Sequence, residues 1–333
     1  MIVDCAHYRE GQRQHEGPME LEEAAGICMN GDGFVWLGLF EPDAAELAQV
    51  QRRFGLHDLA VEDAQSFHLR PKIEQYDGGI FFVVLRTARY VDERAEVEFG
   101  EVAIFLSERF IITVRQGVAS DLHGARVRLE TRPELLRAGT AAVLWAIFDI
   151  VVDDYAPVVE SLERDIENVE SIVFGGAAAP THRIYELRRE ATDFYRTVHP
   201  LLGPLDGLER GAYMPLGKEL QQFFRDVNDH LKLVNEEVAA QRDLLATVLQ
   251  ANMAVISVEQ TEISVRQSET TKQLTVMATI FLPLTFITGF FGMNFGWLIG
   301  HISSLQVFLI EGVGTLVVSC LVLSLWFRRS GHL

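Results

Sequence analysis

The sequence predicts a membrane protein of mixed α+β and α class: an N-terminal cytoplasmic α/β domain, a very long stalk helix, and two C-terminal transmembrane helices. Three observations support this. Short runs rich in Val, Ile, Phe and Trp occur within the first 120 residues. No glycine or proline interrupts residues 218–282. Between residues 273 and 327, Glu311 is the only formally charged side chain. A bilayer span needs about 20 apolar residues, so this last stretch holds two spans.

The predicted organisation follows the chain in order. We expect a cytoplasmic α/β domain with a helical extension over residues 1–210, a stalk helix over 215–272, a first transmembrane helix over 273–291, an external loop over 292–302, a second transmembrane helix over 303–327, and a basic tail over 328–333.

Composition excludes several classes of protein. The 333 residues carry a net charge of −18, whereas nucleic-acid binding proteins present basic patches. The cysteines, Cys5, Cys28 and Cys320, are scattered, so neither a disulfide framework nor a structural zinc site is expected. The start of the sequence has no basic region followed by an apolar core, so we expect no signal peptide and a cytoplasmic first domain.

The N-terminal part combines strand-like and helical runs. β-type runs, rich in branched and aromatic residues, lie at Gly33–Phe40, Gly79–Arg86, Val97–Leu106 and Phe110–Val114. Helical segments lie near Asp43–Phe54, Leu56–Gln65, Ala141–Phe174 and His182–Val198. Strands and helices that alternate in this way favour α/β layers.

The stalk is predicted from a periodic pattern. Apolar residues recur at helical spacing from Phe224 through Val238 to Leu249. A continuous helix over the glycine- and proline-free run would be about 97 Å long at 1.5 Å per residue. Such a length is typical of a coiled-coil-like stalk, and its last part is the first membrane helix.

The charges that flank the apolar stretch predict its orientation. Arg266 and Lys272 precede the first span, Arg328 and Arg329 follow the second, and the connecting loop has neither Lys nor Arg. Under the positive-inside rule, both termini lie in the cytoplasm and the loop lies outside. A cell membrane, in bacteria the inner one, is therefore the expected location.

A short motif follows the first apolar helix, and other motifs precede it. They are Phe291-Gly292-Met293-Asn294-Phe295, the stretch His68-Leu69-Arg70-Pro71-Lys72-Ile73-Glu74, Val152-Asp153-Asp154-Tyr155, and Phe224-Arg225-Asp226-Val227-Asn228-Asp229-His230. With two C-terminal membrane helices and a basic tail, the chain resembles the CorA family of divalent-cation channels over nearly its whole length. The resemblance implies a homopentamer in a lipid membrane, with Mg²⁺ as the transported and regulatory ion and no organic cofactor.

The resemblance makes Gly292, Met293 and Asn294 the expected selectivity filter. Mg²⁺ holds its water tightly, so a filter need not remove the hydration shell. Carbonyl oxygens of Gly292 and amide oxygens of Asn294 can accept hydrogen bonds from the waters of the ion without trapping it. The alternative is that the triplet only caps the helix, because Gly and Asn both suit C-terminal caps.

One face of the same helix is a candidate pore wall. Counting back from the triplet, Thr285, Leu282, Ala278, Leu274 and Thr271 repeat at a spacing of three or four residues. Family members line the pore with the matching positions, which implies hydrophobic constrictions at Leu274 and Leu282 that gate by dewetting. Packing against lipid or another helix is the alternative for both leucines.

Two aspartates on the stalk are candidate regulatory ligands. Asp226 and Asp229 are three residues apart and share a helical face. The resemblance implies that Mg²⁺ binds between neighbouring subunits with Asp226 as one ligand, and that loss of this ion favours opening. The partner acid is expected near residues 90–93, where Val91 follows Tyr90 and Asp92 is the first acid. A solvated charged face is the alternative.

The membrane end departs from the family pattern. The loop 296–304 contains no Asp or Glu, although family members often carry an acid after the filter, and His301 stands there instead. Glu311 lies inside the second membrane helix, where acids are candidates for a role in transport. It could instead hydrogen-bond a neighbouring subunit or reach the membrane interface.

The expected function is therefore a Mg²⁺ channel that also passes Co²⁺ or Ni²⁺. A zinc transporter of the same superfamily and a membrane-anchored sensor or scaffold are the alternatives. No Walker A, GxSxG or HExxH motif is present, so an enzyme is not expected.

Overall fold

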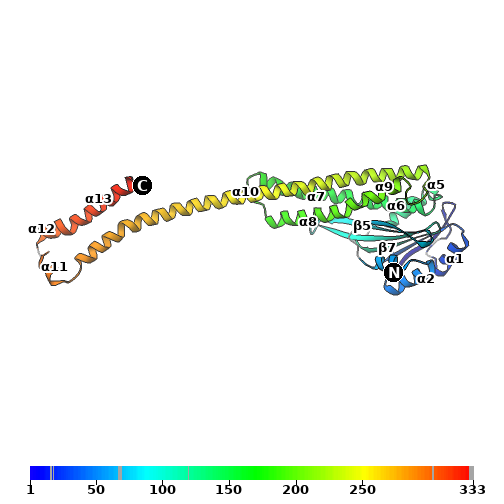
Figure 1. Ribbon diagram of the computed structural model, residues 1–333, viewed down its shortest axis with the longest axis horizontal. Coiled ribbons are helices and arrows are strands. Elements are labelled where there is room, and N and C mark those ends of the chain that lie inside the picture. The colour runs from blue at the N-terminus through cyan, green and yellow to red at the C-terminus, as the bar shows by residue number, and fades with distance from the viewer. Residues whose placement is uncertain (16, 18, 67–69, 119, 302–303, 330–333) are drawn as a thin grey trace. The chain divides into compact units, whose positions relative to one another are not determined.

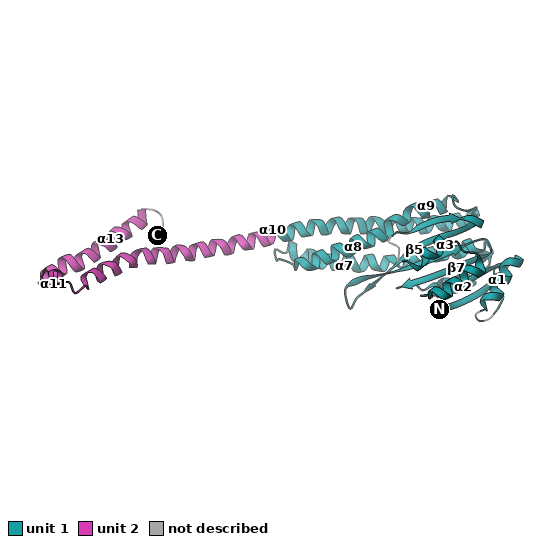
Figure 2. Cartoon of the chain, turned by 60° about the horizontal axis from the view of Figure 1, so that its bottom comes forward, with its two compact units in different colours: residues 1–253 teal, residues 254–333 magenta. Residues whose placement is uncertain are grey.

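The computed structural model describes residues 1–15, 17, 19–66, 70–118, 120–301 and 304–329. His68 and Leu69 of the second motif, residues 302–303 at the expected start of the second span, and the last four residues of the tail lie outside this description. The chain divides into two compact units, residues 1–253 and 254–333, which are described separately (Figure 2).

Unit 1 is built on one mixed β-sheet. Its strands are β1 (Ile2–Arg9), β2 (Gln12–Arg13), β3 (Phe34–Phe40), β4 (Lys72–Tyr76), β5 (Ile80–Val91), β6 (Glu96–Leu106) and β7 (Phe110–Gly117). Their order across the sheet is β2-β1-β3-β7-β6-β5-β4. Strands β3 and β7 pair in parallel, from Val35 opposite Phe110 to Phe40 opposite Arg115, and the other pairs are antiparallel.

The four strands expected from the sequence are confirmed as β3, β5, β6 and β7. Strands β1, β2 and β4 were not expected, because their sequences carry polar residues that mask a strand pattern. In β1, for example, Asp4 pairs with Arg13 at 3.0 Å. Strand β4 lies at the edge of the sheet, where its side chains are partly or fully exposed.

Alternation along the strands gives the sheet two apolar faces. Val35 and Leu37 of β3 belong to a core closed by α1 (Leu21–Asn30), α2 (Ala44–Phe54) and α3 (Asp58–Gln65). Phe34 and Trp36 of the same strand belong to the core on the other side. Figure 1 shows α1 and α2 on one face of the sheet and the longer helices on the other. The α/β layers predicted from the sequence are therefore confirmed.

The second face carries a helical layer. Its elements are α4 (Leu122–Glu130), α5 (Pro133–Leu136), α6 (Thr140–Asp153), α7 (Tyr155–Phe174), α8 (Thr181–Val198), η2 (His199–Leu201) and α9 (Leu202–Glu209). The single helix expected over residues 141–174 is two helices that meet at Asp154. A short 3-10 turn, η1 (Asp77–Gly79), connects β4 to β5 on the sheet.

The long helix predicted from residue 218 is confirmed as α10 (Lys218–Phe291), which has 74 residues. It continues through Pro283. Its first part packs on the helical layer of unit 1. The buried apolar side chains of that part recur at helical spacing, with the buried Gln241 between the last two pairs, and they are Leu220, Phe224, Val227, Leu231, Val234, Val238, Leu245 and Val248.

Buried amides fasten this part of α10 to the helical layer. Asn252 is fully buried; its Oδ1 accepts the Ala179 N–H at 2.8 Å, and its Nδ2 donates to the Ala179 carbonyl at 3.1 Å. Gln241 Nε2 donates to the Val159 carbonyl of α7 at 3.0 Å. Asn228 donates to two carboxylates at the α9 end of the layer. Each donor has its partner at one fixed position. These bonds therefore set the register of α10 against α7, α9 and the α7–α8 turn.

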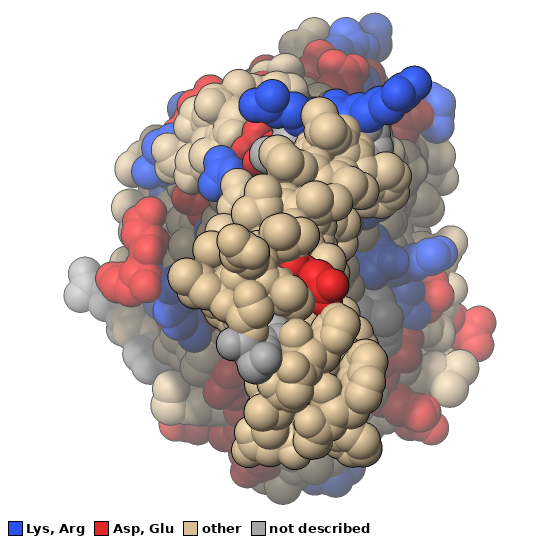
Figure 3. Space-filling model, turned by 90° about the vertical axis from the view of Figure 1, so that its left-hand side faces the viewer, with Lys and Arg blue, Asp and Glu red and all other residues tan. Residues whose placement is uncertain are grey.

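Unit 2 contains the remainder of α10, α11 (Gly296–His301), α12 (Leu305–Val307), the π-helical segment η3 (Phe308–Val313) and α13 (Gly314–Arg329). Two helical stretches, α10 and Leu305–Arg329, are long and apolar enough to cross a membrane. Large apolar side chains such as Leu282, Phe286 and Ile310 are each more than 70% exposed. The foreground of Figure 3 displays the largely uncharged surface of this unit. An apolar surface of this extent is typical of contact with lipid or with other chains.

Replacement of Asn252 by alanine is expected to destabilise unit 1. The change leaves the buried N–H and carbonyl of Ala179 without partners, at about 3 kcal/mol in the free energy of unfolding. Denaturant unfolding of the full chain in detergent measures this loss. Gln250→Ala, an exposed amide on the same helix, is the matched control. If Asn252→Ala loses no more unfolding free energy than Gln250→Ala, Asn252 does not anchor α10 to the helical layer.

Glu190 of α8 is expected to make stability depend on pH. The pKa of Glu190 is raised from 4.5 to about 7. Burial is the main cause. The charges of Glu96, Asp165 and Glu186 raise the pKa further, and the charge of Arg183 opposes them. A carboxyl with a raised folded pKa contributes stability that is full below pH 4.5 and is lost as the pH rises through 7.

Glu190→Gln removes this titration. At pH 8 the variant is expected to be about 1–2 kcal/mol more stable than the wild type, a figure reduced for partial solvent screening. At pH 5 the two are expected to be nearly equal. Thermal unfolding at both pH values, with the exposed Glu167→Gln as control, measures the difference. Equal gains at pH 5 and pH 8 contradict it.

Candidate functional site

The triplet Gly292-Met293-Asn294 lies directly after the last residue of α10. The Gly292 N–H donates to the Thr288 carbonyl at 2.9 Å, and the Met293 N–H donates to the Phe290 carbonyl at 3.2 Å. The three residues are exposed. Within the described chain, neither the Gly292 carbonyl nor the Asn294 side chain takes part in a hydrogen bond. Neutral oxygens at this helix end are therefore available to a ligand.

The backbone conformation of Gly292-Met293-Asn294 tests the alternative that this triplet only caps the C-terminus of α10. The common C-terminal cap places glycine or asparagine in the left-handed region. Neither Gly292 nor Asn294 has a positive φ, whereas Gly31 and Gly55 adopt that conformation where they end α1 and α2. The triplet therefore does not form the left-handed cap that its residue types would suit.

The candidate pore stripe lies on an exposed face of α10. Thr271, Leu274, Ala278, Leu282 and Thr285 are all exposed in the single chain. The exposed fractions are 63% for Leu274 and 76% for Leu282. The Thr285 hydroxyl donates to the Phe281 carbonyl at 2.8 Å, so this hydroxyl is turned back onto its own helix. One chain alone leaves the whole stripe uncovered.

Asp226 lies in an acidic cluster that sequence reasoning missed. Asp149 and Asp153 of α6 stand near it, and the ring of His230 lies 3.7 Å from Asp153. Arg128 forms an ion pair with Asp149 at 2.8 Å. Burial first, and then the charges of Asp153 and Asp226, raise the pKa of Asp149. The spacing of four residues between Asp149 and Asp153, on the helix that leads into the Val152–Tyr155 motif, was the available signal.

Asp229 and Asp92 make contacts outside this acidic cluster. Asp229 pairs with Lys232 on its own helix at 3.2 Å. Asp92 is exposed in the β5–β6 turn and lines a cavity of about 340 Å³ with Asp121 and Asp154. Burial raises the pKa of Asp154, and Asp153 and Asp121 raise it further.

The described parts of one chain do not assemble a complete cation site. They contain no group of three or more His, Cys, Asp or Glu side chains that could hold a metal ion. Carboxylates are the ligands that Mg²⁺ prefers.

Glu311 has a partner within its own chain. Its carboxylate lies 3.4 Å from Nε2 of His301, and the His301 ring stacks on Trp297 with centroids 5.3 Å apart. Glu311 belongs to the π-helical segment η3, a conformation that is frequent at functional sites. His301 of the loop segment therefore contacts Glu311, the acid of the second apolar helix.

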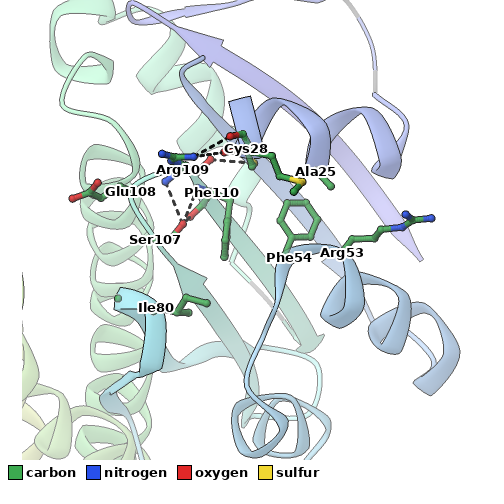
Figure 4. Close-up of a pocket in the computed structure, with 12 residues that line it drawn as sticks. Ala25, Cys28, Arg53, Phe54, Ile80, Ser107, Glu108, Arg109 and Phe110 are labelled. Carbon is green, nitrogen blue, oxygen red and sulfur yellow. Dashed lines mark hydrogen bonds between the residues drawn. The ribbon is translucent and has the colours of Figure 1, made fainter. Parts of the chain in front are cut away.

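A further cavity, of about 550 Å³, lies between α1, α2 and the β6–β7 turn (Figure 4). Arg109 donates to the Cys28 and Met29 carbonyls at 3.0 and 3.2 Å, and Arg53 pairs with Glu22. Burial raises the pKa of the Cys28 thiol to about 11, so it stays protonated at neutral pH. Two guanidinium groups and one carboxylate, that of Glu108, line this cavity, so its charge does not favour a cation.

Comparison with known proteins places the chain among metal-ion transporters. Residues 31–329 match the family model described as CorA-like Mg2+ transporter protein. The chain is 28% identical over 338 residues to the putative metal ion transporter YfjQ of Bacillus subtilis, covering 99% of this chain and 98% of that protein. It is 29% identical over 266 residues to the cobalt/magnesium transport protein CorA of Thermotoga maritima, covering 79% of this chain and 74% of that protein.

The fold agrees with these matches. The complete structure of the CorA magnesium transporter from Methanocaldococcus jannaschii aligns with 100% of both chains at a TM-score of 0.64 and 19% identity. At this identity the likeness concerns the fold, and it includes the α/β domain, the long helix and the apolar C-terminal helix. Because the family model spans most of the chain, the protein belongs to the CorA-like Mg2+ transporter family.

Proposed function

We propose that the protein is a homopentameric channel that conducts hydrated Mg²⁺, and also Co²⁺ or Ni²⁺, across a cell membrane. Five copies of α10 line the pore, and rings of Gly292 carbonyls and Asn294 amides, with Met293 between them, select the ion. The observation that carries this proposal is the position of the triplet: it follows α10 directly, and the Gly292 carbonyl and the Asn294 amide make no hydrogen bond to the described residues. The cobalt/magnesium transport named for the relative supports the choice of ions.

Elementary ion chemistry favours neutral oxygens at such a filter. Mg²⁺ dehydrates reluctantly, and carboxylates at the narrowest point would bind it tightly. Conduction requires binding that is weak enough to allow release. Entry of a divalent ion at about −100 mV gains about 4.6 kcal/mol, so no second energy source is needed.

The remaining candidate residues have distinct roles in this proposal. Leu274 and Leu282 form apolar constrictions, and Thr271, Ala278 and Thr285 complete the pore wall. Their exposure in one chain supports coverage by other copies. Both termini lie in the cytoplasm, the triplet and its loop lie outside, and lipid surrounds the outer helices.

Regulation is proposed to depend on carboxylates of adjacent subunits. Asp226 lies in the acidic cluster with Asp149, so a bound divalent cation would relieve repulsion there. Asp92 of a neighbouring copy is the proposed partner, and Asp229 a further acid near the same face. Cation loss then favours the open state, because repulsion between the facing carboxylates returns.

Membership of a transporter family confirms that the chain is not an enzyme. The alternative function is a zinc transporter of the same superfamily, in which Zn²⁺ is the transported ion. The described residues contain no His and Cys cluster suited to Zn²⁺, so no structural observation favours it.

Asn294→Ala is expected to abolish ion flux, because the ring of amide oxygens disappears while the helix remains. The assay uses proteoliposomes at a set potential, with Mg²⁺, Co²⁺ and Zn²⁺ in separate runs. Gln306→Ala, an exposed amide in the same unit, is the control and should retain wild-type flux. Full Mg²⁺ flux in Asn294→Ala would falsify the filter. Zn²⁺ flux that needs a proton gradient, with none for Mg²⁺, would overturn the proposed ion.

Asp226→Asn is expected to weaken inhibition by internal Mg²⁺. Loss of one ligand charge should raise the internal concentration that half-inhibits flux by about tenfold, within the usual range of allosteric coupling. Asp243→Asn, an exposed acid on the same helix, should leave it unchanged. Equal shifts in the two variants contradict a sensing role for Asp226.

A further inference from the structure

A cavity of about 770 Å³ lies in unit 1, between the sheet and helix α8. Arg86 of β5 and Phe99 of β6 line it from the sheet. Tyr195 and Arg196 of α8 line it from the helical layer, and His199 of η2 stands at its end. This volume lies within the range of small-molecule sites, about 300–1,000 Å³. It is also much larger than a single ion requires.

The lining of this cavity is basic, although the whole chain is strongly acidic with a net charge of −18. Arg70, Arg86 and Arg196 contribute three guanidinium groups, and Asp193 is the one acid among the lining residues of the described chain. Guanidinium groups outnumber carboxylates in this lining, and an excess of one charge concentrates ions of the opposite sign. Its ligand is therefore expected to be an anion.

Arg86 contributes a buried, charged side chain to the wall of the cavity. Its side chain is buried, with 8% exposed, and its guanidinium carbon lies 4.9 Å from the centroid of the Phe99 ring. Burial lowers the pKa of Arg86, and the charge of Glu101 opposes that effect. Contacts with its neighbours already hold this guanidinium in place, so little rotamer entropy would be lost if a ligand bound beside them.

The other guanidinium groups stand closer to solvent. The Arg196 side chain is 71% exposed and reaches Asp193 at 3.3 Å, and Arg70 is also exposed. Guanidinium forks match the geometry of phosphate oxygens and bind them through paired, charge-assisted hydrogen bonds. One buried and two exposed guanidinium groups fit a ligand that carries several phosphate oxygens.

The aromatic wall of the cavity is held in place by contacts with neighbouring side chains. The Tyr195 ring stacks with His199, with centroids 4.8 Å apart and an interplanar angle of 16°. Arg242 of α10 lies over the same tyrosine at 4.6 Å. His199 also contacts Asn235 of α10, at 3.0 Å. The wall of the cavity therefore touches α10 at two positions, both within unit 1.

We propose that this cavity binds a phosphate-bearing small anion, with phosphate oxygens on Arg86, Arg196 and Arg70 and any planar group on the Phe99 and Tyr195 side. Binding here is independent of ion conduction, so it stands or falls separately from the proposed channel. Asp193 opposes the anion by charge and tunes its affinity.

Equilibrium binding to the full chain in detergent tests the proposal. Isothermal titration with ATP, pyrophosphate and inorganic phosphate, in separate runs without divalent cations, identifies the ligand class that binds. We expect saturable binding of at least one of these anions, one per chain, that weakens as salt is added. No saturable binding of any of the three overturns the proposal.

Variants at exposed positions avoid the risk of unfolding that a change at Arg86 carries. Arg196→Glu and Arg70→Glu are each expected to weaken binding at least about tenfold, the effect of losing a hydrogen bond to a charged group. Asp193→Asn is expected to tighten binding several-fold, because the one opposing charge is removed. Arg188→Glu, exposed on the same helix but outside the cavity, is the control. A loss in Arg188→Glu equal to that in Arg196→Glu, or weaker binding in Asp193→Asn, contradicts the site.

Discussion

The structure of unit 1 depends on the packing and the buried hydrogen bonds that hold the first part of α10 against the helical layer. Apolar side chains at every third or fourth position supply the buried contact, but such contacts alone would tolerate sliding by one turn. The amides of Asn228, Gln241 and Asn252 remove that freedom, because their partners are fixed atoms of α7, α9 and the α7–α8 turn. A slip of one turn would leave buried polar groups unpaired, at a cost larger than the apolar contact could return.

The same fastening brings two groups of charges to α10. The acidic cluster around Asp149 reaches the helix at Asp226, and the basic cavity reaches it at Asn235 and Arg242. These positions lie on a helix whose register in unit 1 is set by the buried amides. Both groups of charges therefore meet one helix, which continues, without a helix boundary, to Phe291. Coupling between distant sites through such an element requires that each ligand prefer one arrangement of it.

Charge is distributed very unevenly along the chain. Nearly all acids and bases lie before residue 273, and Glu311 stands alone within the last apolar stretch. An isolated carboxylate in an apolar environment is costly, and its contact with His301 offsets part of that cost. The neutral oxygens of the triplet belong to the same uncharged environment. In the proposed channel, attraction of a cation there depends on dipoles and amides and not on formal charge.

The sequence by itself determined the long helix, four strands of the sheet, the two apolar spans and the triplet at the end of α10. These features depend on local pattern: apolar periodicity, the absence of Gly and Pro between Lys218 and Leu282, and the absence of charge after residue 272. Strands β1 and β4 were not predicted, because polar residues interrupt their apolar patterns; both pair with a neighbouring strand. Only the tertiary structure decided that Asp149 joins Asp226, that His301 meets Glu311, and that Arg70, Arg86 and Arg196 line one cavity. Those groups are separated in sequence, so their proximity depends on strand order and helix packing, which local periodicity does not encode.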